Sequence, residues 1–223
     1  DSPYDEYGRL NKSLSWNMAN PLYEAEFGNY NEGTNRTFTN SLSFRWDVLP
    51  GFFINGTGTI VTWKERKEIF TSPESKVFED ATSRSEQGSL YVYNERYLKY
   101  EGKFFLNYAR NFGEKLLLTL HGGFDISKST TTTDAYTAYG FYKPELHAPN
   151  FAAGFGEGKR PSGSDDISTS IGPFVNANLI VLNRYFVDGS FRRSGSSKFG
   201  DENRFAPFWS VGAGWNIHNE EFA

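Results

Sequence analysis

The sequence predicts an all-β fold, an antiparallel transmembrane β-barrel of which these 223 residues supply about seven strands. Three observations support this prediction. Large apolar side chains alternate with polar ones at a period of two along seven segments. Aromatic residues make up 17% of the chain and Gly is frequent, a β-rich composition. Long and short connections alternate along the chain, as they do in outer-membrane barrels.

The strands are expected where the alternation is regular. In the first of them, Leu42, Phe44 and Trp46 share one parity, whereas Ser43 and Arg45 share the other. This spacing predicts a strand with one apolar face and one polar face. The same reasoning predicts strands at residues 38–48, 52–63, 90–110, 115–128, 167–181, 185–193 and 205–217.

The connections fall into two classes. Segments that are charged, or rich in Thr, Gly, Pro and Tyr, show no period and predict long external loops at 1–36, 64–88 and 129–166, with a medium one at 195–203. Short turns are expected at 49–51, 111–114 and 182–184. Since antiparallel strands joined this way put all long loops at one end, the asymmetry favours a barrel with short periplasmic turns.

A soluble β-sandwich is the competing fold, because its strands also alternate between a buried and a wet face. Two features favour the membrane barrel. The last expected strand has about ten alternating residues, which matches a tilted crossing of the hydrocarbon layer and exceeds the usual strand of about 5–6. Aromatic residues such as Trp46, Tyr185 and Trp215 collect at strand ends, as at a membrane interface.

Seven strands cannot close a membrane barrel alone. Single-chain bacterial barrels have an even strand count of about 8 or more. Unpaired strand edges are also forbidden in lipid. The chain is therefore expected to be one part of a larger barrel domain.

Composition excludes several functions. The chain has no cysteine, which removes disulfides, thiolate nucleophiles and Cys-based zinc sites. A net charge of -4 and a pI near 5.5 give no electrostatic case for nucleic acid. The mean hydropathy of -0.58 and the lack of a long apolar run argue against a transmembrane helix.

No catalytic or metal site is predicted, so the chain is not expected to be an enzyme or to hold a cofactor. His121, His147 and His218 are expected in a strand, a loop and a turn, too far apart to cooperate. Ser196 follows Gly195 but lacks the strand–turn–helix context of a nucleophile elbow.

Residues 188–222, DGSFRRSGSSKFGDENRFAPFWSVGAGWNIHNEEF, resemble a barrel segment of the SusC/RagA-type TonB-linked outer-membrane transporters. The stretches SPYDEYG at 2–8 and NPLY at 20–23, and the LPG turn at 49–51, are similar to the family as well. The departures are conservative, such as Ser194 where Asp is usual and Phe205 where Trp is usual.

The resemblance implies a plugged barrel of the 22-strand type in the outer membrane of a Gram-negative bacterium. It implies import of a nutrient, an oligosaccharide or oligopeptide, powered through TonB, with a SusD-like lipoprotein as an external lid. The plug and the TonB-box are expected to lie outside these residues. A soluble carbohydrate-binding β-sandwich and a non-transporting barrel scaffold in a surface complex remain alternatives.

Substrate contacts are expected in the longest predicted loop. Tyr136, Tyr139, Phe141 and Tyr142 form an aromatic cluster in sequence that suits stacking on sugar rings or peptide side chains. The same residues also suit packing within the loop or contact with the lid lipoprotein, and both interpretations stay open.

Overall fold

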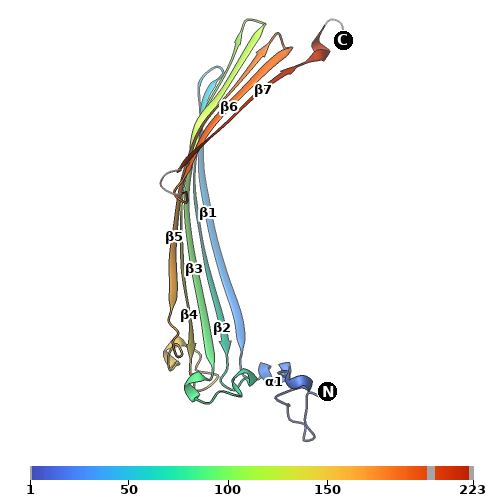
Figure 1. The fold of residues 1–223 in the computed structure, drawn as a ribbon, viewed down its shortest axis with the longest axis vertical. Coiled ribbons are helices and arrows are strands. Elements are labelled where there is room, and N and C mark those ends of the chain that lie inside the picture. The colour runs from blue at the N-terminus through green and yellow to red at the C-terminus, as the bar shows by residue number, and fades with distance from the viewer. Residues whose placement is uncertain (1, 200–203, 221–223) are drawn as a thin grey trace. The chain divides into compact units, whose positions relative to one another are not determined.

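The computed structural model describes residues 2–199 and 204–220. Within them, seven strands form one sheet in sequence order, with consecutive strands paired as hairpins (Figure 1). The strands are β1 (Tyr30–Leu49), β2 (Phe52–Thr71), β3 (Ser89–Phe112), β4 (Leu116–Tyr139), β5 (Ser162–Val181), β6 (Tyr185–Ser196) and β7 (Phe205–Trp215). The predicted all-β fold is confirmed.

The helical elements are short and lie in the connections. They are η1 (Ser15–Asn17), α1 (Pro21–Ala25), η2 (Lys76–Phe78), η3 (Arg84–Glu86), η4 (Pro149–Phe151) and η6 (Ile217–Asn219). None of the helices in the described part of the chain is long and apolar enough to cross a membrane.

Several strands are longer than the sequence predicts. β2 continues through residues 64–71 and β4 through 129–139, both expected to be loop, while β5 begins at Ser162 and β1 at Tyr30. The added segments carry polar side chains on both faces, so the alternation that reveals a half-apolar strand is missing there. β7 ends at Trp215, before the predicted end. Residues 200–203 of the predicted loop 195–203 lie outside the described residues.

The chain divides into two compact units, each containing parts of several strands. Unit 1 comprises 1–37, 63–96 and 131–165, and unit 2 comprises 38–62, 97–130 and 166–223. The two units differ in where their apolar side chains lie.

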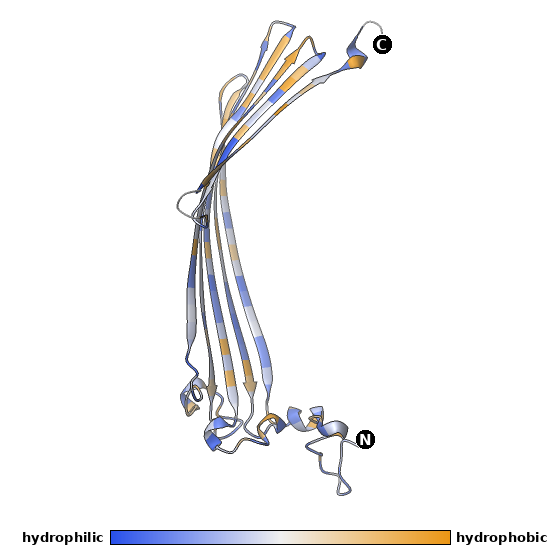
Figure 2. Cartoon of the chain, viewed as in Figure 1, coloured by the Kyte–Doolittle hydropathy of each residue, from blue (hydrophilic) through white to orange (hydrophobic). Residues whose placement is uncertain are grey.

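Unit 2 carries its large apolar side chains on one exposed face of the sheet, here called the apolar face. Leu42 is 78% exposed, Trp209 76% and Val211 71%. Figure 2 shows the underlying alternation as orange and blue bands along the strands. Others on this face include Phe38, Phe44, Trp46, Ile60, Leu98, Phe124, Ile126, Val175, Val187 and Phe191. Contiguous exposed apolar surface of this kind marks a contact with lipid or another apolar partner.

The opposite face of unit 2, here called the polar face, is joined by hydrogen bonds between neighbouring strands. The hydroxyl pairs Ser41–Thr59 and Ser190–Ser210 lie 2.9 and 2.6 Å apart. The Arg192 guanidinium forms an ion pair of 2.6 Å with Asp125. Polar groups that satisfy one another in this way tolerate either water or a wet protein surface above them.

Some glycines make room for aromatic rings from a neighbouring strand. The Phe44 ring of β1 covers Gly56 on β2, and the Phe186 ring of β6 covers Gly214 on β7. A Cβ atom at either glycine would overlap the ring. Each pair therefore fixes its register through a cross-strand contact that only Gly permits.

Gly123 of β4 gives a sharp test of strand pairing. A Cβ atom there would overlap the backbone carbonyl oxygen of Phe104, whereas one at Gly122 would lie 3.5 Å from its nearest neighbour, the Phe174 oxygen. Gly123→Ala should therefore cost about 1–3 kcal/mol of folding free energy, the usual range for overpacking. Gly122→Ala should cost less. Denaturant unfolding of the two variants measures both, and equal losses would contradict the assigned pairing.

Unit 1 has a small buried core. Phe70, Leu90, Val92, Ala138 and Phe141 are at most 3% exposed, and Tyr30, Tyr136 and Ala152 pack against them. The Tyr30 and Phe70 rings stack with centroids 5.7 Å apart. The connection after β4 is held to the one before β3 by backbone bonds, since the amides of Gly140 and Phe141 both donate to the Gln87 carbonyl at 3.0 Å.

The N-terminal segment is tied down within unit 1 by Asn20. Its buried side chain donates to the carbonyls of Pro3 and Asn11 at 2.9 and 2.7 Å and accepts from the Leu22 amide at 3.1 Å, capping α1. A buried amide with these partners orders a segment that has no strand of its own.

Candidate functional site

The polar face of unit 2 carries an aromatic cluster among its polar side chains. The His121 ring on β4 stacks on Phe174 of β5, with centroids 5.3 Å apart, and lies 5.6 Å from Phe105 of β3. Asn107 fixes the imidazole, since its Oδ1 lies 2.5 Å from the His121 Nδ1. We call these three rings the polar-face aromatic cluster.

A charged pair borders this cluster. The Arg192 guanidinium lies 6.0 Å from the Phe174 ring centroid while paired with Asp125, and its Nε donates to the Ser194 hydroxyl at 2.9 Å. An adjoining hollow of about 430 Å³ is lined by Phe174, Asn176, Ser190, Arg192, Phe208 and Ser210. Aromatic faces beside a guanidinium can stack on a sugar ring or an apolar side chain and bind a carboxylate.

The alternation in the sequence contains a signal for this cluster. Phe105 and Phe174 occupy the parity that otherwise carries Lys103, Asn107 and Asn176. An aromatic residue on the wet parity is a departure that packing alone does not require. Phe105 stands out in the sequence as such an exception, whereas Phe174 emerges only when the structure pairs it with His121.

The four predicted loop aromatics do not form one cluster. Phe141 is fully buried in the unit 1 core. Tyr136 packs against that core and meets Phe155 edge-on at 5.9 Å. Tyr139 accepts a hydrogen bond of 2.8 Å from Lys159 Nζ. Tyr142 is 65% exposed, with the Arg84 guanidinium 5.1 Å from its ring centroid. Of the four, Tyr142 presents most of its ring to solvent.

The three histidines lie in separate surroundings. His121 stacks in the polar-face aromatic cluster, His147 lies 5.6 Å from both Tyr30 and Phe70, and His218 is in η6. Across the described residues, no group of three or more His, Asp or Glu side chains is arranged to hold a metal ion.

Charges in unit 1 shift the pKa of a few groups. The hydrogen bond from Tyr93 to the Glu95 carboxylate raises the pKa of Tyr93 to about 12. The Arg9 backbone amide holds the pKa of Asp5 below its ordinary value. Hydrogen bonding from Lys76 lowers the pKa of Glu79. These groups keep their charge states at neutral pH, so no acid–base chemistry is indicated at these positions.

The chain is similar in structure to known transport proteins. No family model matches the chain. It superposes on the RagAB peptide importer in its closed-closed state with a TM-score of 0.82 at 18% identity, covering 99% of this chain and 24% of that one. The RagAB peptide transporter gives 0.78 and the open-open state 0.74. The sheet therefore has the fold of part of the RagAB peptide importer.

A sequence match adds a similarity to a TonB-dependent receptor. The chain is 38% identical over 55 residues to the TonB-dependent receptor SusC of Bacteroides thetaiotaomicron, a match that spans 25% of this chain and 6% of SusC. The predicted resemblance to the SusC/RagA-type transporters is confirmed. The chain spans about a quarter of the length of the RagAB structures. The matched proteins are a receptor and importers, not enzymes, in agreement with the sequence-based expectation.

Proposed function

We propose that the chain forms part of the barrel of a TonB-dependent transporter in the outer membrane of a Gram-negative bacterium. The barrel imports an oligosaccharide or an oligopeptide, with a SusD-like lipoprotein as its external lid. The observation that carries the proposal is the pair of faces in unit 2, one apolar and exposed, the other polar and hydrogen-bonded.

The apolar face supports contact with lipid. Leu42, Trp209 and Val211 are more than 70% exposed in the chain itself. Burying an apolar side chain is worth about 1.5–3 kcal/mol relative to leaving it in water, so a row of such residues strongly favours a hydrocarbon environment. A plugged barrel meets that need while pairing the backbone groups of every strand.

The polar face supports a wet interior. Glu101 pairs with Lys99 at 2.5 Å and with Lys103 at 2.7 Å, and Asp125 pairs with Arg192. Charges paired in this way cost little beside a water-filled or plugged lumen and would be costly against lipid. The polar-face aromatic cluster then faces the barrel interior, where it can meet a plug or a substrate.

Substrate or lid contact is proposed for Tyr142, in the connection after β4, and for Tyr139 at the end of that strand. Tyr142 presents an aromatic ring backed by the Arg84 guanidinium. Such a platform suits a sugar ring, a peptide side chain or a partner protein surface.

Energy coupling tests the import function directly. Cells that carry the intact transporter should take up labelled oligosaccharides or oligopeptides, and uptake should fall to the level of the gene deletion when TonB is inactivated. Affinity purification of the intact transporter should also retain a surface lipoprotein. Import would be refuted if neither deletion of the transporter gene nor inactivation of TonB changed the uptake of any oligosaccharide or oligopeptide. A barrel that still inserts normally would then be a scaffold.

A further inference from the structure

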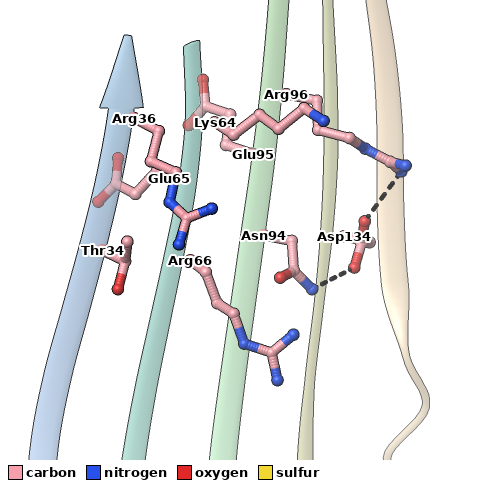
Figure 3. A pocket seen from close by; sticks show the side chains of 9 residues that line it. All are labelled: Thr34, Arg36, Lys64, Glu65, Arg66, Asn94, Glu95, Arg96 and Asp134. Carbon is pink, nitrogen blue, oxygen red and sulfur yellow. Dashed lines mark hydrogen bonds and ion pairs between the residues drawn. The ribbon is translucent and has the colours of Figure 1, made fainter.

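A second cluster of charged side chains lies in unit 1. A hollow of about 500 Å³ is lined by side chains from β1 to β4, among them Arg36, Lys64, Arg66, Arg96, Asn94 and Asp134 (Figure 3). We call it the basic hollow. Four cations share it, which raises the question of what neutralises them.

Two of these cations lie directly opposite each other. The Tyr30–Phe70 stack fixes the pairing of β1 with β2, and counting two residues at a time from it places Arg36 opposite Lys64. Like charges in opposing positions of an antiparallel pair are destabilising. Both side chains are exposed, so core packing does not explain why two cations occupy these opposing positions.

Local counter-charges satisfy only part of the basic hollow. Asp134 pairs with Arg96 at 3.3 Å and accepts from Asn94 at 2.8 Å, and Glu68 accepts from Arg66 Nε at 2.9 Å. In the described part of the chain, no ion pair is formed by Arg36 or Lys64.

Two glutamates also border the basic hollow, but their carboxylates do not neutralise its cations. Glu65 and Glu95 sit on the other parity of β2 and β3, where side chains leave the sheet on the opposite face. Glu95 already accepts a hydrogen bond from the Tyr93 hydroxyl. An anion from outside the chain would therefore offset the repulsion between Arg36 and Lys64.

The position of these cations along their strands indicates the source of that anion. Phe38 follows Arg36 by two residues on the same face of β1, and Leu98 follows Arg96 in the same way on β3. Phe38 is 60% exposed and Leu98 37%. Basic residues that directly continue a lipid-facing row meet the headgroup layer, where phosphate is the anion available.

We propose that the basic hollow binds the phosphate of a membrane lipid headgroup, with Arg36 and Lys64 as its principal ligands. Guanidinium and ammonium groups are the usual partners of phosphate, and Arg can bind it through two parallel hydrogen bonds. The inference rests on the proposed membrane location of the apolar face. It assigns these strands a role in fixing an anionic lipid, separate from transport.

The test compares lipid binding by the intact transporter and two variants in detergent. Native mass spectrometry gives dissociation constants for phosphatidic acid, which carries an exposed phosphate, and for phosphatidylcholine. The wild type should prefer phosphatidic acid. Arg36→Gln/Lys64→Gln should weaken that binding about fivefold for each charge removed, because a basic residue near an anionic membrane surface contributes about 1 kcal/mol. Phosphatidylcholine binding should not change.

Lys67→Gln is the matched control. Lys67 lies on β2 between Arg66 and Glu68 but on the opposite face, so its loss should leave phosphatidic acid binding unchanged. The proposal is overturned if the double variant binds like the wild type, if Lys67→Gln is equally defective, or if inorganic phosphate competes as well as the lipid does. Insertion of the wild type into phosphatidylcholine bilayers is measured separately. If the wild type inserts into these bilayers but does not prefer phosphatidic acid in detergent, this inference alone is overturned. Failure to enter them overturns the proposed function too.

Discussion

Leu42→Arg should prevent stable insertion of the barrel, at a cost of about 2–4 kcal/mol for a cation near the bilayer midplane. Leu42 lies on β1 among the residues of the apolar face and is 78% exposed. In a soluble protein a substitution at so exposed a position would change stability by about 0.5 kcal/mol or less. The fraction folded in lipid bilayers, followed by denaturant titration, measures the difference.

Ser43→Arg is the control for that prediction. Ser43 is the next residue on β1 and lies on the polar face, where its hydroxyl is 3.0 Å from that of Thr57. An arginine there reaches the wet interior, so the expected cost is about 1 kcal/mol for the lost hydrogen bond. Equal effects of the two substitutions, or wild-type stability of Leu42→Arg, would rule out a lipid-facing apolar face.

Phe141→Ala should have the second large effect, a loss of about 3–5 kcal/mol from the unit 1 core. Phe141 is 0% exposed and meets Phe70 edge-on at 5.4 Å. Its removal leaves a cavity where the connection after β4 packs against β2 and β3. Hydrogen exchange of the Gly140 and Phe141 amides, which donate to Gln87, should accelerate accordingly.

Tyr142→Ala separates core packing from surface contact. Tyr142 is the next residue and is 65% exposed, so its truncation should leave hydrogen exchange at Gly140 nearly unchanged. If Tyr142→Ala accelerated exchange as much as Phe141→Ala, the connection would be held by its surface aromatics. The core described for unit 1 would then be wrong.

The parts of the fold that the sequence predicts are those with one apolar face. In β7, Trp209, Val211 and Trp215 share a parity, and the structure places all three on the apolar face. A sheet with one apolar face and one polar face imposes a period of two on the sequence, and this period does not depend on the loops. The number of strands and their order follow from the same signal.

The strand extensions could not be predicted because polar side chains fall on both parities along most of their length. Between Trp63 and Phe70 the chain reads KERKEI, in which cations and anions fall on either parity, so no period distinguishes strand from loop. Only pairing with β1 and β3 makes this segment β2. Tertiary pairing overrides local composition here.

The four predicted loop aromatics occupy different surroundings for a related reason. Tyr136 and Tyr139 lie on opposite parities of β4, and the chain turns at Gly140 (φ 80°), which sends Phe141 into the core and Tyr142 outward. The four aromatic residues are therefore close in sequence, but their rings do not form one cluster. The polar-face aromatic cluster was missed because Phe105, His121 and Phe174 come from three strands.

We infer that the apolar face of unit 2 lies against lipid while the polar face lies in a wet interior. Because the chain has no cysteine, Leu42→Cys and Ser43→Cys each provide a single labelling position within it. A bimane label on each, with the intact transporter in bilayers, reports its surroundings through quenching by brominated acyl chains or aqueous iodide. The label at position 42 should be quenched by brominated lipid and the one at 43 by iodide. Quenching of both by iodide alone would contradict the claim.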